Sequence, residues 1–75
     1  MNYQIYKLEN DKWNKVEIED IKRYDIIRVF DLDAGEYSTN SDGSITSIVV
    51  RGAYQDSEKL WSIDSKPYKF EGGSL

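Results

Sequence analysis

The stretch Asp25-Ile26-Ile27-Arg28-Val29-Phe30 (D-I-I-R-V-F) decides the fold predicted for this chain, because four of its six residues are apolar. A short apolar run rich in β-branched and aromatic residues is typical of a strand in the middle of a sheet. We therefore expect a central strand over 25–30 that is buried on both faces. The charged residue inside it, Arg28, is expected to lie at an edge or to pair with an acidic side chain.

Alternation of apolar and polar residues continues on both sides of this stretch. Residues 2–8 and 13–18 alternate and are separated by the polar tetrad Glu9-Asn10-Asp11-Lys12, a combination that predicts a β-hairpin. The connection at 19–24 interrupts the alternation with at most one helical turn. Further short strands are expected at 37–39, 44–51 and 60–64, with an edge strand at 68–70.

Two local signals place turns and irregularities between these strands. Asp42-Gly43 is the strongest turn signal in the chain, because this pair suits the positive φ values of tight hairpin turns. Gly52 is expected to mark a bulge or a bend.

The predicted fold class is all-β, an antiparallel meander curled into a small barrel of five or six strands. An open flat sheet would expose its edge strands, and curling reduces that exposure. Seventy-five residues are too few for two cores, so we expect one domain over 1–70 and a flexible tail at 71–75.

Composition excludes several classes of protein. The chain has no cysteine and no histidine, so it cannot form a disulfide framework, a zinc finger, a haem or iron–sulfur site or a Ser-His-Asp triad. Its 14 acidic and 10 basic residues give a net charge of −4, which argues against direct nucleic-acid binding. The longest apolar run, Ile48-Val49-Val50, is too short to cross a membrane, and no leader pattern is present, so we expect a cytoplasmic protein.

The acidic residues are concentrated in the middle of the chain, where eight acidic and three basic residues lie between positions 17 and 42. If these acids gather in space, they form a negative patch suited to a host protein with a basic surface. The other interpretation is a solvated face that keeps strand edges unpaired. The expected partner-binding residues lie in the longest exposed connection and are Asp31, Asp33, Glu36 and Tyr37.

The same connection invites comparison with a calcium-binding loop through Asp31-x-Asp33-x-Gly35 and Asp42. The glycine stands one place early, the closing residue is Asp instead of Glu, and no helix is expected on either side. We therefore interpret it as an acidic loop and expect no metal and no cofactor. No pair of carboxylates is singled out and no glycine-rich phosphate loop occurs, so no enzymatic activity is expected.

Residues 12–30 resemble a known sequence pattern, K-W-x-x-V-x-I-x-D-I-K-x-G-D-I-I-R-x-F, of short uncharacterised proteins from bacteriophages and mobile elements. Residues 50–63 are similar to the second half of those proteins, A-x-P-Y-x-N-E-D-G-x-W-x-I. Tyr24 stands where the pattern has glycine, and Tyr54 is not preceded by its proline. The resemblance covers about two thirds of the chain and implies a small β fold and an origin on a mobile element.

Part of this pattern also recurs in Hint and intein modules, whose catalytic Cys or Ser and His have no counterpart here, so protein splicing is excluded. The expected function is therefore binding of a host macromolecule in the bacterial cytoplasm through an acidic, tyrosine-rich surface, as a counter-defence inhibitor of a nuclease would do. Two alternatives stay open: a structural or assembly module that forms a homo-oligomer through edge strands, and a protein that sequesters a small molecule.

Overall fold

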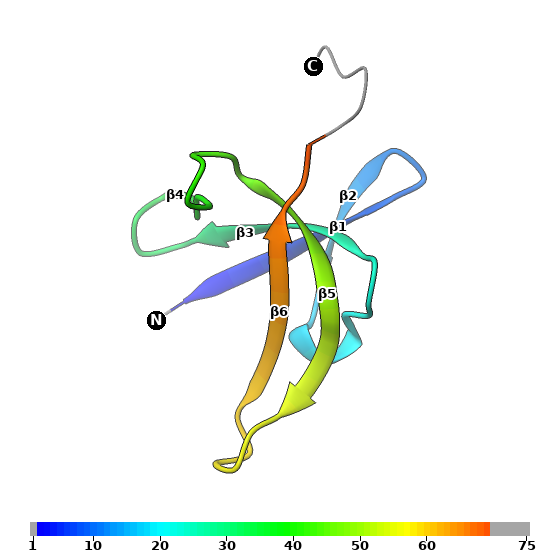
Figure 1. The fold of residues 1–75 in the computed structure, drawn as a ribbon. Helices are drawn as coiled ribbons and strands as arrows, with labels where there is room; N and C mark the ends of the chain where they lie inside the picture. Colours follow the sequence, from blue (N-terminus) through cyan, green and yellow to red (C-terminus); the bar gives the residue numbers. More distant parts are fainter. Residues whose placement is uncertain (1, 70–75) are drawn as a thin grey trace.

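The computed structural model describes residues 2–69, which form six strands of one antiparallel sheet (Figure 1). A single turn of 3-10 helix, η1 (Ile18–Asp20), follows the second strand, and no α-helix occurs within 2–69. The predicted all-β class is therefore confirmed. The strands are β1 (Tyr3–Glu9), β2 (Lys12–Val16), β3 (Ile26–Asp31), β4 (Glu36–Tyr37), β5 (Thr46–Gln55) and β6 (Trp61–Pro67).

The strand order is β2-β1-β3-β5-β6, with the short β4 paired to the end of β3. The chain is thus not the simple meander that we predicted, because β3 joins the free edge of β1 and not that of β2. The segment between β2 and β3, residues 17–25, carries Ile18 and Ile21, which pack into the core. Since these two side chains must reach the interior, this segment crosses the inside of the sheet instead of making a tight turn.

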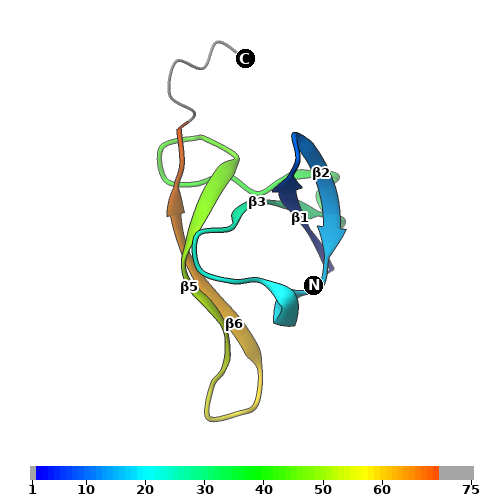
Figure 2. The same cartoon turned by 90° about the vertical axis from the view of Figure 1, so that its right-hand side faces the viewer.

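The sheet curls without closing into a full barrel, because its outermost strands, β2 and β6, are not paired with each other. Figure 2 shows the β1–β2 and β5–β6 halves standing apart, with η1 and the segment that follows it between them. This crossover segment, residues 17–25, bonds to β5 through its backbone: Ala53 N donates to Ile21 O (3.0 Å), Tyr24 N to Val49 O (2.8 Å) and Val49 N to Asp25 O (2.9 Å).

Side chains alternate between two faces of the sheet, and the register assigns each to one of them. The inner face holds the core, in which Ile21, Ile27 and Val49 are at most 2% exposed. Around them pack five partly buried residues, Ile5, Val16, Ile18, Val29 and Ile63. We call the opposite side of the sheet the outer face; it carries, among others, Tyr6, Trp13, Arg28, Phe30 and Ile48.

The strongest local predictions are confirmed. The β1–β2 hairpin turns at Asn10 and Asp11, whose φ values of 49° and 65° are those of the tight turn that matches the twist of the strands. β3 lies in the centre of the sheet, as predicted. The 40–43 segment is a turn, closed by a hydrogen bond from Gly43 N to Asn40 O, but it does not join paired strands, because β4 and β5 both pair with β3.

The C-terminal third differs from the prediction. β5 continues to Gln55, beyond the predicted end at 51, because register shifts on either side of Arg51 let it bend and stay paired with β6. β6 runs to Pro67, so Tyr68 and Lys69 are not part of a strand and the edge strand predicted at 68–70 is wrong there. Phe70 and the tail predicted at 71–75 lie outside the described residues.

Gly52 lies where the crossover segment passes over β5. A Cβ atom at this position would stand 3.1 Å from the Cα of Lys22, 3.2 Å from the N of Arg23 and 3.2 Å from the O of Ile21. All three are backbone atoms, which cannot rotate away as a flexible side chain would. Glycine therefore permits the close approach that seats the crossover segment on β5, in addition to the predicted bulge.

We expect Gly52→Ala to lower the free energy of unfolding by about 1–3 kcal/mol, because the added methyl group forces the crossover backbone away from β5. Urea unfolding followed by tryptophan fluorescence measures the effect. Ser57→Ala, in the exposed β5–β6 turn, is the control and should stay within about 0.5 kcal/mol of the parent protein. Equal stability of Gly52→Ala and the parent protein would show that the crossover is not packed this closely.

Candidate functional site

The four predicted partner-binding residues lie in the β3–β4 hairpin, but they do not share one face. Asp31 and Glu36 stand directly opposite each other, and Asp33 lies in the turn between them. Tyr37 pairs with Phe30 and therefore projects from the other side of the hairpin. The structure brings the three carboxylates together and separates them from the tyrosine.

Asp31 organises the turn. Its Oδ1 accepts hydrogen bonds from the backbone N–H groups of Asp33 (2.9 Å) and Ala34 (3.1 Å), and its carbonyl accepts one from Gly35 N (2.8 Å). Gly35 has a φ of 73°, which suits glycine. The Asp-x-Asp-x-Gly spacing is therefore explained by the local chemistry of a turn, and no group of three or more potential metal ligands occurs within residues 2–69.

The three carboxylates of this hairpin have no basic neighbour at ion-pair distance in the described part of the chain, where the ion pairs are those of Lys7. Asp33 Oδ2 accepts a hydrogen bond of 3.3 Å from the N–H of Asn2, and Glu36 is exposed. Like charges placed directly opposite each other on paired strands reduce stability. Asp31 and Glu36 therefore form an unfavourable pair with no basic side chain at ion-pair distance within residues 2–69.

The other acidic residues between 17 and 42 lie on different elements. They therefore do not join the hairpin carboxylates on one element. Glu19 and Asp20 belong to η1, and Asp25 pairs with Lys7. Asp42 accepts hydrogen bonds from the hydroxyl (2.6 Å) and the N–H (2.9 Å) of Ser44, which lower the pKa of its carboxyl group. The β3–β4 hairpin thus carries only some of the acidic residues of this segment.

We expect Glu36→Lys to raise the free energy of unfolding by about 0.2–1 kcal/mol, because an opposite-charge pair with Asp31 replaces the like-charge pair. Urea unfolding at low salt measures the change. Glu36→Gln removes the repulsion without adding an attraction and should have a smaller effect in the same direction. A loss of stability in both variants would contradict the repulsion inferred from the register.

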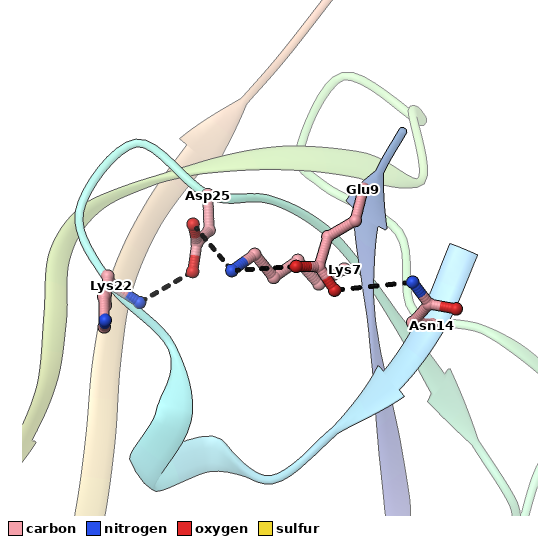
Figure 3. A network of polar contacts seen from close by, with 5 residues as sticks. All are labelled: Lys7, Glu9, Asn14, Lys22 and Asp25. Carbon is pink, nitrogen blue, oxygen red and sulfur yellow. Dashed lines mark hydrogen bonds and ion pairs between the residues drawn. The ribbon is translucent and has the colours of Figure 1, made fainter. Parts of the chain in front are cut away.

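A second polar group lies on the inner face and links β1, β2 and the crossover segment (Figure 3). Lys7 Nζ lies 3.4 Å from Asp25 Oδ1 and 3.7 Å from Glu9 Oε2. The other oxygen of Asp25 accepts the N–H of Lys22 (2.8 Å), and Asn14 Nδ2 donates to Glu9 (3.4 Å). The side chains of Lys7 and Asp25 are 22% and 14% exposed, so this pair holds the crossover segment to β1 and offers little surface to a ligand.

The outer face forms a third candidate site, which the sequence did not reveal. Cross-strand pairs place Lys15, Tyr6, Arg28 and Thr46 in one row across β2, β1, β3 and β5. A neighbouring row holds Gln4, Phe30 and Tyr37. The elements that pack inside the sheet, η1 and the crossover segment, lie against the inner face, so none of the described elements covers the outer one.

Side chains on the outer face support one another. The Arg28 guanidinium lies 4.3 Å from the centre of the Trp13 ring, and Arg28 Nε donates to Thr46 Oγ1 (2.9 Å). The rings of Phe30 and Tyr37 meet edge to face with centroids 5.1 Å apart. The structure corrects two predictions about β3. Arg28 lies in the central strand against a tryptophan and not beside an acid. The strand is fully buried at Ile27, while its outer-face residues keep some exposure.

Tyr24 stands out for a different reason, because its φ of 76° is in the left-handed region that favours glycine. This is the position at which the resembled pattern has glycine. Tyr24 is 68% exposed, and the centre of its ring lies 4.9 Å from the Arg23 guanidinium. Glycine at this position would relieve the strain that a tyrosine carries in this conformation.

One hollow of about 260 Å³ opens beside the start of β1 and the end of β2, lined by Tyr3, Gln4, Ile5, Lys15, Val16, Glu17 and Ile18. It falls below the range of about 300–1,000 Å³ that is usual for small-molecule pockets. No buried, unpartnered polar atom marks a ligand position among the described side chains.

Comparison with known proteins identified no matching family model, no matching curated protein and no matching solved structure. In residues 2–69 there is no helix of the length and apolarity needed to span a membrane.

Proposed function

We propose that this protein is a non-enzymatic binding protein whose acidic β3–β4 hairpin contacts a basic surface on another protein. The observation that carries the proposal is the direct opposition of Asp31 and Glu36, with Asp33 in the same turn and no basic side chain paired to them within residues 2–69. The arrangement is unfavourable in the free protein and becomes favourable against cations.

Charge and aromatic surface are combined in this hairpin. Three neighbouring negative charges raise the rate at which a basic partner is encountered and fix its orientation. On the other side of the hairpin, Tyr37 is 37% exposed and rests on Phe30, so its ring is held in place before binding. Tyrosines that bury on binding supply much of the energy of protein interfaces.

The resemblance of residues 12–30 to proteins of bacteriophages and mobile elements supports a setting in the host bacterial cytoplasm. A nuclease is a suitable class of target, because its substrate-binding surface is basic and carboxylates can occupy positions that otherwise hold phosphates. In this setting the protein acts as a counter-defence inhibitor that blocks the surface without any reaction of its own.

The test is the double variant Asp33→Lys/Glu36→Lys, used to capture partners from a bacterial lysate. Asp31 is left unchanged because its carboxylate holds the turn. We expect a basic protein that the parent protein retains to be lost with this variant, and the complex rebuilt from purified components to weaken as salt is raised.

Glu19→Lys/Glu58→Lys is the matched control, because it changes the net charge equally at two exposed positions outside the β3–β4 hairpin. It should retain the same partner. Equal retention by the hairpin variant and the control, or equal loss from both, would refute a role for this hairpin.

The assembly alternative has one observation in its favour, since β2 and β6 end the sheet with unpaired edges. Both edges also carry features that oppose pairing: Lys12 and Lys15 on β2, and Lys66 and Pro67 on β6. Sedimentation of the purified protein distinguishes the two functions. A closed oligomer without partners supports assembly, and a monomer supports binding.

A further inference from the structure

We propose that the outer face of the sheet binds single-stranded nucleic acid, with phosphates on its basic side chains and bases stacked on its aromatic rings. This site is separate from the carboxylates of the β3–β4 hairpin and does not rest on the function proposed for them.

The charge of the outer face is opposite to that of the whole chain. Its paired positions hold Lys15, Arg28 and Lys66, and no carboxylate occurs in the rows of Tyr6, Phe30 and Ile48. Electrostatic effects of exposed charges fall off over about 10 Å in ordinary salt. Acids farther away than this distance therefore weaken the local attraction of this face for an anion only in part.

The carboxylates nearest to these rows lie at their borders. Asp64 is beyond the bulge of β5, where it stands opposite Arg51 and accepts a hydrogen bond from the Tyr54 hydroxyl (3.1 Å). Glu17 follows the end of β2 and lines the hollow with Lys15. Neither carboxylate lies in the rows of Tyr6, Phe30 and Ile48.

Aromatic rings occupy four neighbouring strands of the same face: Trp13 on β2, Tyr6 on β1, Phe30 on β3 and Tyr37 on β4. All four retain some exposure. Arg28 fixes the Trp13 ring, and Tyr37 fixes the Phe30 ring, so little side-chain freedom is lost on binding. Uncovered sheet faces with rings on adjacent strands are suited to stacking unpaired bases.

The combination of cations and aromatic rings favours single-stranded nucleic acid over other anionic partners. A duplex hides its bases from a flat sheet face and offers phosphates alone. An acidic polypeptide would match the cations of these rows, but it would not present a flat aromatic ring at every unit of its chain. An unpaired strand presents phosphates and stacking surfaces together, as this face requires.

The experiment measures the fluorescence anisotropy of labelled 12-nucleotide oligo(dT) and oligo(U) with the full chain at low and moderate salt. The expected result is binding that weakens with salt.

Lys15→Gln/Lys66→Gln changes two exposed positions and should lower the slope of log affinity against log salt by about 1.4, since each phosphate contact adds about 0.7. Tyr6→Ala should weaken binding about 5- to 150-fold, the range for loss of one stacked base. Lys59→Gln, which removes one charge at the distant β5–β6 turn, is the control and should bind as the parent does.

Tryptophan fluorescence tests stacking independently, because the chain has two tryptophans on different parts of the sheet. In Trp61→Phe, Trp13 is the sole reporter and oligo(dT) should quench it. In Trp13→Phe, Trp61 remains and should not respond. Neither variant removes an aromatic ring, so both should fold.

Three results would overturn the proposal. The first is no binding of either oligonucleotide at about 100 µM protein, the weak limit of ordinary non-specific association. The second is equal binding of a duplex of the same length, which would assign the face to phosphates without stacking. The third is equal competition by polyglutamate, which would assign it to an acidic polypeptide.

Discussion

The fold depends on one close backbone contact, that between the crossover segment and β5. Hydrogen bonds join Ile21, Tyr24 and Asp25 to this strand, and Gly52 leaves room for the segment to approach. Without this contact Ile21, one of the three most buried apolar residues, would lose its place in the core between the two halves of the curled sheet. A domain of this size has little apolar surface to spare, so one such contact carries much of its stability.

The same contact explains why one side of the sheet is uncovered. The crossover is the only connection described in residues 2–69 that packs across a face of the sheet, and it lies on the inner one. Outer-face residues therefore have no second layer from residues 2–69 to pack against, and they contact one another instead. Arg28 lies on Trp13 and bonds to Thr46, which is 5% exposed. A single-layer sheet thereby presents half-buried aromatic and basic groups to a partner.

Charge is segregated in the same way. The carboxylates of the β3–β4 hairpin lie at strand ends and in the turn between them, while the cations Lys15, Arg28 and Lys66 lie on strands of the outer face. Lys7 is on the inner face and is neutralised by Asp25 and Glu9. One small acidic chain therefore carries two surfaces of opposite sign, an acidic hairpin and a basic aromatic face, and we propose a different class of partner for each.

Local sequence determined the features that depend on neighbours along the chain. Alternation and the Asn10-Asp11 turn determined the first hairpin, because both side-chain direction and positive φ are local properties, and the apolar run at 25–30 determined the central strand. Tertiary structure alone decided the partner of Arg28, the continuation of β5 to Gln55 beyond its bulge and the side of the hairpin on which Tyr37 lies. Each of these depends on which strands become neighbours and which face the crossover covers. The alternation of residues along a strand is the same whatever the order of the strands in the sheet. The sequence therefore could not show which face of the sheet is buried and which is uncovered.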